Sequence, residues 1–330
     1  MKLIFAGTPA NAATTLRWLL ASGHEVVAVL TRPDAPIGRK RVVTPSPVAQ
    51  LAQDAGIPVI KANRVDESLA AQIAATGAQL GVIVAYGALL KKFALDALPL
   101  GWVNLHYSLL PDWRGAAPVQ NSILHGDRET GVTLFQLDEG MDTGPILNSV
   151  STAINPGENA GRLLVRLTDL GNTLLGETLP LMEAGLVKSS PQQSTGSTRP
   201  AVKLFRENAQ VDWSKPAREI ENLVLALNPE PMAHTFLNNQ PFRLIDARAT
   251  SASAPIKDFS CGTLHIDGSK VLVACGSGTA LELLTVQPAG KNQLAAADWA
   301  RGASSPTLTF QDQVSEAPSK STSQASNNER

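Results

Sequence analysis

The sequence predicts an α/β protein whose first half builds a mostly parallel sheet and whose second half builds a small β-barrel. In the first half, short apolar runs alternate with helical patterns, which is typical of a parallel sheet covered by helices. Beyond about residue 200, short strands are separated by Asp-Gly and other Gly-rich turns, which favours a barrel. With 330 residues, of which 43% are hydrophobic and 17% charged, the chain is long enough for two domains.

Composition excludes several classes of protein. The formal net charge of -1 gives no global reason to expect nucleic acid, so any basic surface must be local. Gly7 and Pro9 interrupt the apolar N-terminus, and no run approaches the ~18 residues of a membrane span. Cys261 and Cys275 form no CxxC pair, which favours free buried thiols over a disulfide. We therefore expect a cytoplasmic protein that does not bind a membrane.

Strands and helices alternate from the start of the chain. Residues 2–6, 25–30, 58–60, 81–85 and 102–105 have the apolar composition of buried strands. A helix is predicted between the strands at 25–30 and 58–60. Ser46 and Pro47 form a favourable N-cap and first-turn pair for it, and Gly56 ends it. A similar helix begins at Asp66 and ends at Gly77.

A further strand is predicted over residues 131–137, where GVTLFQL alternates. It leads into DEGMDTG, in which Gly140 and Gly144 bracket Asp142. Glycines on both sides indicate a loop whose backbone takes unusual angles to place one carboxylate. A leucine-rich helix is expected from about residue 161 to 183.

The character of the chain changes after this helix. Residues 188–200 are polar and contain two prolines, which indicates an interdomain linker. Beyond the linker, a helix starts near Ser214 and short strands follow, whereas the last residues are rich in Ser, Gln and Asn and predict disorder. We expect an N-terminal domain at residues 1–187, a linker at 188–202, a barrel domain at 203–303 and a disordered polar tail at 304–330.

The stretch VNLHYSLLPDWRGAAP, residues 103–118, carries the most chemistry. Side chains two apart on a strand share a face, so Asn104 and His106 project together, at the strand end where α/β folds build their sites. A lone histidine is usually structural. Here an amide lies beside the imidazole, and Asp142 can supply an orienting carboxylate, so the three residues predict an acid-base site.

The segment RPDAPIGRKRVVTPSP, residues 32–47, is long and proline-rich, with Arg39, Lys40 and Arg41 at its centre. Such a charge run is usually a solvated loop. A loop this long in a compact α/β unit nevertheless favours a function, and three adjacent cations suit phosphate contacts with a nucleic acid.

A nicotinamide-dinucleotide site is a weak alternative for the first strand and its turn. The dinucleotide fingerprint needs three glycines, and only Gly7 is present there. The second strand ends in Thr31 and Arg32, without an acidic residue for a ribose. A tight turn between strand and helix explains the glycine.

Several motifs together resemble the 10-formyltetrahydrofolate-dependent formyltransferase family. The resemblance is carried by NLHYSLLPDWRGAAPVQNSILHGD followed by GVTLFQLDEGMDTGPIL. FAGTP, GRKRVVTPSPV, AYG, KLFRENAQVDWSKPA, NPEPMA and QPAGKNQL resemble the branch of the family that acts on methionyl-tRNA. The resemblance covers about residues 1 to 302. The sequence departs from the family pattern at Ala10 and Asn11, where the family usually has an acidic and an aromatic residue.

The resemblance implies a doubly wound catalytic domain and a C-terminal OB-like barrel that helps to hold tRNA. It implies Asn104, His106 and Asp142 as catalytic residues, and Ser108, Leu109, Leu110 and Pro111 as the folate-binding segment. Arg39 corresponds to the loop arginine used near the acceptor end of initiator tRNA, and Lys40 and Arg41 lie beside it. The implied partners are 10-formyltetrahydrofolate and initiator methionyl-tRNA. No metal and no obligate protein partner are expected, and we expect a monomer.

Two other functions remain open from the sequence. A second formyltransferase hypothesis replaces the acceptor by a sugar-nucleotide amine, a glycinamide or water, for which a basic loop and a barrel are not needed. A third hypothesis is a tRNA-binding protein without catalysis, against which the intact Asn104, His106 and Asp142 speak. The barrel region is not broadly basic, because residues 201–299 hold nine Lys or Arg against ten Asp or Glu.

Overall fold

The computed structural model describes residues 1–38, 40–193, 198–251, 256–302 and 307–311. The chain divides into two compact units. The first comprises Met1–Phe205 with Leu225–Pro229, and the second comprises Arg206–Val224 with Glu230–Arg330.

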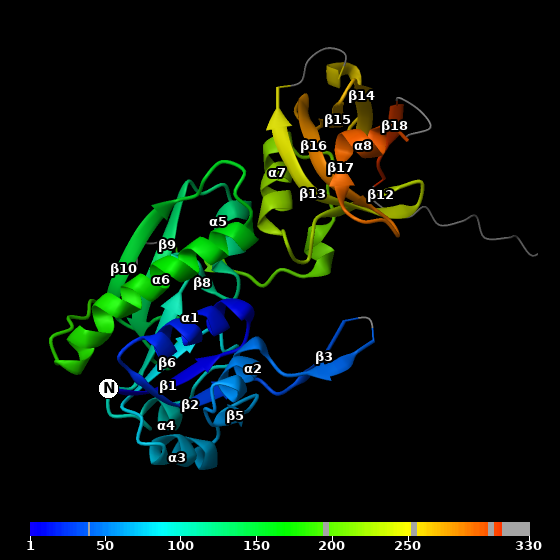
Figure 1. Ribbon diagram of the computed structural model, residues 1–330. Coiled ribbons are helices and arrows are strands. Elements are labelled where there is room, and N and C mark those ends of the chain that lie inside the picture. Colours follow the sequence, from blue (N-terminus) through cyan, green and yellow to red (C-terminus); the bar gives the residue numbers. More distant parts are fainter. Residues whose placement is uncertain (39, 194–197, 252–255, 303–306, 312–330) are drawn as a thin grey trace, which may run out of the picture. The chain divides into compact units, whose positions relative to one another are not determined.

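The first unit is built on a seven-stranded sheet (Figure 1). Its strand order is β10 (Ile146–Ala153), β9 (Glu129–Gln136), β7 (Trp102–His106), β6 (Leu80–Val84), β1 (Lys2–Gly7), β2 (Glu25–Thr31) and β5 (Val59–Lys61). The strands from β7 to β5 pair in parallel, whereas β9 and β10 are antiparallel. The predicted mostly parallel sheet is therefore confirmed.

Helices cover both faces of this sheet. One face packs against α1 (Ala10–Ala21), α2 (Pro47–Asp54), α5 (Pro118–Leu124) and α6 (Ala160–Glu183), and the other packs against α3 (Glu67–Ala75) and α4 (Lys92–Leu95). The strands are apolar throughout because neighbouring residues face opposite layers: Leu3 lies in one core and Ile4 in the other. The doubly wound arrangement is confirmed, as is the N-cap of α2, where the Ser46 side chain accepts a hydrogen bond from the Ala49 N–H.

The order of the strands determines where a site can form. The chain runs from β1 outward to β2 and β5, then returns to the other side of β1 to add β6 and β7. At such a reversal, the connections leave the carboxyl ends of neighbouring strands in opposite directions and open a crevice. Residues that follow β6 and end β7 are therefore candidates for ligand contact.

The basic segment after β2 contains a short hairpin of β3 (Ala35–Ile37) and β4 (Val42–Thr44). Lys40 and Arg41 lie at its turn, whereas Arg39 lies outside the described residues. Ile37, Val42 and Val43 are each more than half exposed. The hairpin therefore presents both charged and apolar side chains.

The predicted linker packs against the first unit in its described part. Ser190 forms a bridge with Ile146, and β11 (Pro200–Ala201) pairs in parallel with β8 (Arg114–Gly115). β8 lies inside the chemically dense stretch identified from the sequence. This segment therefore crosses the part of the first unit where the candidate site residues are found.

The second unit is an antiparallel barrel. Its sheet has the order β12 (His234–Leu237), β13 (Gln240–Thr250), β16 (Thr279–Pro288), β15 (Lys270–Cys275), β14 (Thr263–Asp267) and β18 (Thr307–Thr309), and β17 (Leu294–Ala295) pairs with β16. A bridge between Phe236 and Gln311 joins the two ends of this sheet. The other elements described there are η1 (Arg206–Ala209), α7 (Ala217–Ala226), whose last two residues belong to the first unit, η2 (Ile256–Asp258) and α8 (Ala296–Ala300). The expected barrel is confirmed.

The structure differs from the expected tail at residues 307–311. Their composition predicts disorder, but β18 pairs with β14 and Phe310 is buried. The Phe310 ring stacks on Trp213, with ring centroids 5.2 Å apart. One buried aromatic residue outweighs the polar composition around it, because its burial stabilises the strand. The rest of the expected tail, 304–306 and 312–330, lies outside the described residues.

Both cysteines are free thiols, as expected. Cys275 is buried, and burial raises its pKa to about 12, but Cys261 is exposed, so the expectation of burial is wrong for that residue. Among the helices that the structure describes, none is long and apolar enough to span a membrane.

Candidate active site

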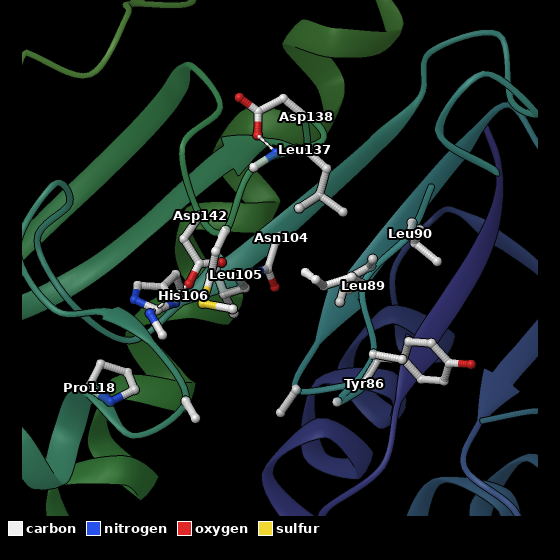
Figure 2. Close-up of a pocket in the computed structure, with 18 of the residues that line it drawn as sticks. Tyr86, Leu89, Leu90, Asn104, Leu105, His106, Pro118, Leu137, Asp138 and Asp142 are labelled. Atoms are coloured by element: carbon white, nitrogen blue, oxygen red, sulfur yellow. Dashed lines mark hydrogen bonds and ion pairs between the residues drawn. The ribbon is translucent and has the colours of Figure 1, made fainter. Parts of the chain in front are cut away.

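A cavity of about 480 Å³ opens at the carboxyl ends of β6 and β7 (Figure 2). Four chain segments and Leu95 of α4 line it: the segments are 83–90, which ends β6 and continues into the following loop, 104–107, which ends β7, 115–118, and 137–142, which follows β9. The side chains of Asn104, His106 and Asp142 lie together, apart from Tyr86, Leu89 and Leu90 on the other side of the cavity. The structure thus brings the three predicted catalytic residues together.

His106 is the last residue of β7, and its side chain is only 6% exposed. Its Nε2 lies 2.8 Å from the Trp113 carbonyl oxygen. A carbonyl can only accept, so Nε2 carries a proton. In the neutral imidazole the other nitrogen, Nδ1, is therefore a free base. The sequence predicts Asp142 as the group that orients the imidazole, whereas in the structure the Trp113 carbonyl sets the tautomer.

Asp142 faces the free nitrogen of His106. Its Oδ2 lies 3.8 Å from His106 Nδ1 and accepts a hydrogen bond of 2.8 Å from the Gly115 N–H. The left-handed backbone angle occurs at Asp142 itself, with φ +54°. Gly144 is required for a different reason, because a Cβ there would meet the Gln136 carbonyl oxygen at 1.8 Å. The Gly115 N–H therefore holds the carboxylate, and the close backbone approach at Gly144 holds the loop that carries it.

The pKa of His106 is lowered from its ordinary value. The main cause is burial, which disfavours the imidazolium. The negative charge of Asp142 and the hydrogen bond to Trp113 act in the opposite direction and raise the pKa. The ring is thus held neutral, with a carboxylate placed to stabilise the cation that forms when Nδ1 takes a proton.

Asn104 lies on β7, two residues before His106, and also lines the cavity. Val103 and Leu105 lie in the core on the opposite face, as the strand alternation predicted. The Asn104 side chain makes no hydrogen bond with any residue that the structure describes. Its amide is therefore available to a ligand beside the His106 imidazole.

The segment Ser108, Leu109, Leu110 and Pro111, predicted to bind folate, does not line this cavity. Ser108 is fully buried, and its hydroxyl donates to the Asp112 carbonyl oxygen at 2.7 Å. The Thr133 hydroxyl donates to the Ser108 carbonyl oxygen at 2.7 Å. The segment therefore forms the folded turn that carries the chain from His106 to Trp113.

Sequence reasoning did not identify the apolar walls of the cavity. Leu89 is 64% exposed and Met141 is 56% exposed, although both are large apolar side chains that line the cavity. Their sequence positions gave a partial signal. The AYG motif at residues 85–87 lies just before Leu89, and Met141 lies in the loop between Gly140 and Gly144. Exposed apolar side chains around a cavity indicate a ligand with an apolar surface.

Trp113 is fixed from outside the cavity by Arg199. The Arg199 guanidinium lies over the Trp113 ring at 4.2 Å and forms ion pairs with Asp112 at 2.9 Å and Asp127 at 2.7 Å. The Trp113 ring N–H donates to Asp127, and its backbone N–H donates to the Arg199 carbonyl oxygen. Trp113 has a left-handed φ of +62°, and these contacts hold the carbonyl that binds His106.

Asn11 is one of the two departures from the family pattern. Its Nδ2 donates to the Tyr107 hydroxyl at 3.2 Å, and Tyr107 lines the cavity. Burial raises the pKa of Tyr107, so its hydroxyl stays protonated at neutral pH. Within the described part of the chain, no group of three or more His, Cys, Asp or Glu side chains could hold a metal ion.

Comparison with known proteins identifies relatives over most of the chain. Residues 1–179 match the family model "Formyl transferase", and residues 203–304 match "Formyl transferase, C-terminal domain". The chain is 47% identical over 306 residues to methionyl-tRNA formyltransferase of Paenarthrobacter aurescens (strain TC1), covering 93% of this chain and 98% of that protein. The protein of the same name from Arthrobacter sp. (strain FB24) is 47% identical over 302 residues, covering 92% and 97%.

A solved structure has a similar fold at low sequence identity. The N-formyltransferase from Helicobacter canadensis, in complex with folinic acid and dTDP-3-aminofucose, aligns with a TM-score of 0.63 and 19% identity. The alignment covers 87% of this chain and 99% of that chain. At this identity the likeness concerns the fold alone.

Replacing Asp142 by Asn is expected to lower the pKa of His106 further, because the carboxylate is the charge that favours the imidazolium. The pKa can be measured by NMR titration of the protein with ¹⁵N-labelled histidine rings, the His106 signals being assigned with a His106→Gln variant. Glu139→Gln removes a charge from the same loop at an exposed position and is the matched control. Equal His106 pKa values in Asp142→Asn and the parent protein would contradict the proposed electrostatic pairing.

Proposed function

The chain belongs to the formyl transferase family, and we propose that it transfers the formyl group of 10-formyltetrahydrofolate to the α-amine of methionyl initiator tRNA, giving N-formylmethionyl-tRNA. The relatives named methionyl-tRNA formyltransferase match nearly their whole length and support this acceptor. The single observation that carries the chemistry is the free Nδ1 of His106, which faces Asp142 in a cavity that Asn104 also lines.

The cavity fits the folate co-substrate in size and character. Cavities of roughly 300–1,000 Å³ with apolar walls and few polar groups are typical of small-molecule sites, and this one has a volume of about 480 Å³. Leu89 and Met141, both exposed in the cavity wall, would cover the aromatic rings of the ligand. When bound there, 10-formyltetrahydrofolate supplies the formyl carbon that the amine attacks.

Asn104 would stabilise the negative charge of the reaction. As the neutral amine attacks the formyl carbon, the formyl oxygen gains negative charge, and the Asn104 amide can donate a hydrogen bond to it. The amide has no competing partner among the described residues, so none of its hydrogen bonds must be broken first. Preorganised donors of this kind stabilise a developing oxyanion without reorganisation.

His106 would move the proton. The attacking nitrogen becomes positively charged and must lose a proton, which Nδ1 of the neutral ring can accept directly or through water. Asp142 then stabilises the imidazolium from 3.8 Å. His106 returns the proton to the folate nitrogen N10 as its bond to the formyl carbon breaks, which restores the neutral ring and balances the reaction.

The segment Ser108, Leu109, Leu110 and Pro111 is proposed to support folate binding through the shape of its turn. The Leu110 N–H donates to the Thr133 hydroxyl at 3.2 Å, which joins the turn to β9. This turn leads to Trp113, whose carbonyl holds His106. We therefore keep the segment in the proposed folate site without assigning it a direct contact.

We propose a separate function for each domain. Residues 1–187 would carry formyl transfer, residues 203–303 would help to hold tRNA, and residues 188–202 would connect them. We further propose a cytoplasmic enzyme that acts as a monomer without an obligate protein partner. Size-exclusion chromatography with light scattering would test the monomer, and a dimeric mass would contradict it.

The acceptor can be tested by comparing formyl transfer to charged initiator tRNA, to a sugar-nucleotide amine, to glycinamide ribonucleotide and to water. We expect charged initiator tRNA to be preferred strongly, because a small acceptor uses neither the basic hairpin nor the barrel. Charged elongator tRNA is a control for tRNA identity. Equal rates with all acceptors would refute the tRNA assignment.

Replacing Asn104 by Ala is expected to reduce kcat by about 10²–10³-fold, the usual effect of removing one oxyanion donor. Binding of the folate co-substrate should change little, because the donor acts mainly as charge develops. Rapid-quench kinetics and folate fluorescence titration would separate the two effects. Asn63→Ala, in a loop outside the cavity, is a control variant. A kcat close to the parent value in Asn104→Ala would remove this residue from the mechanism.

The basic hairpin is proposed to contact the phosphates of the tRNA through Arg39, Lys40 and Arg41, although Arg39 lies outside the described residues. Replacing all three by Ala is expected to raise KM for charged tRNA and to reduce the steepness of its salt dependence, because each lost phosphate contact removes counterion release. The control is Arg17→Ala on α1. An unchanged salt dependence in the triple variant would contradict phosphate contact by the hairpin.

A further inference from the structure

Gln192 lies in the segment between α6 and the second unit, and its side chain makes four hydrogen bonds. Its Oε1 accepts from Arg114 Nε at 3.0 Å and from Arg114 Nη2 at 2.6 Å. Its Nε2 donates to the carbonyl oxygens of Asp142 and Gly144, each at 2.8 Å. Gln192 therefore ties the loop that carries Asp142 to the segment that contains Arg114 and Gly115.

Only an amide can make this set of contacts. Arg114 presents donors, which need an acceptor, and the two loop carbonyls need donors. A glutamate could accept from Arg114 but could not donate, when ionised, to the carbonyls. A lysine or arginine could donate to the carbonyls but could not accept. Gln192 combines both requirements in one planar group of the correct length.

The contacts of Gln192 involve the two backbone segments that hold the Asp142 carboxylate. The loop backbone is pinned at Asp142 itself, where φ is +54° and therefore costly to maintain. On the other side, Gly115 donates its N–H to Asp142 Oδ2, and Gly115 directly follows Arg114. Gln192 joins these two segments, so it links the backbone that carries Asp142 to the backbone that binds its carboxylate.

We propose that Gln192 is a positioning residue for formyl transfer, which holds Asp142 where its negative charge stabilises the protonated His106 ring. The proposal rests on the proposed function, in which His106 carries the proton and Asp142 stabilises the resulting imidazolium. It assigns a role in the active site to a segment that the sequence identified only as a linker. Gln192 acts through Asp142 and is not itself a catalytic residue.

The surroundings of His106 make a displacement of Asp142 measurable through the titration of the ring. Asp142 is the carboxylate within ion-pair distance of the ring among the residues described. The Trp113 carbonyl at Nε2 and the Phe135 ring, whose centroid lies 6.3 Å from that of the imidazole, carry no charge. Moving Asp142 away therefore weakens the one charge that favours the imidazolium.

The experiment compares Gln192→Ala, Gln192→Glu and Gln193→Ala with the parent protein. Gln193 is the adjacent exposed glutamine and provides the matched control. In Gln192→Ala we expect kcat for methionyl-tRNA to fall by about 10–100-fold, with KM for both substrates nearly unchanged, since a misplacement of about 1 Å can cost 10²-fold. The His106 NMR titration should move to lower pH. Gln193→Ala should match the parent in both measurements.

Gln192→Glu separates positioning of Asp142 from support of Arg114. It keeps the acceptor for Arg114 and so preserves the packing of that side chain, but it loses the donors to the Asp142 loop. A kcat reduced as in Gln192→Ala supports the proposal, and parental kcat in Gln192→Glu overturns it. An unchanged His106 titration in Gln192→Ala also overturns it. The titration does not require turnover, so an inactive parent protein would refute the proposed function and leave this measurement valid.

Discussion

The hydrogen bond from His106 Nε2 to the Trp113 carbonyl oxygen is the interaction on which the candidate site depends. It places the proton on the buried side of the ring and leaves Nδ1 as a base toward Asp142. The carbonyl belongs to a residue with a left-handed backbone, which stays in place because Arg199 covers its ring and binds its N–H. A tautomer is thus determined by contacts that reach well outside the cavity.

The segment between α6 and the second unit contributes to both halves of the acid-base pair. Arg199 supports Trp113, which holds His106, and Gln192 supports the loop that holds Asp142. Between these residues and the following unit, β11 pairs with β8 beside the same site. Ordering a chain segment costs conformational entropy, which these contacts must offset. A segment that served only as a flexible linker would not make them.

The first unit identifies the formyl donor better than the acceptor. In the proposed function, its cavity with apolar walls would hold the folate, and the three polar side chains would carry out the transfer within the same unit. The acceptor is inferred from relatives that share 47% identity and from the basic hairpin. Recognition of tRNA uses charge and shape over a large surface, and such features are spread over many residues rather than concentrated in a motif.

The sequence by itself determined the two-part architecture and the grouping of Asn104 with His106, because strand alternation is a local property with a period of two residues. It also identified the Asp142 loop from its glycines. Only the tertiary structure decided the tautomer of His106, the strand pairing at residues 307–309, the positions of Leu89 and Met141 in the cavity wall, and the contacts of Gln192. These features depend on contacts between residues distant in the chain, such as Gln192 and Asp142, which are 50 positions apart. Local patterns contain no information about which distant segments the fold brings together.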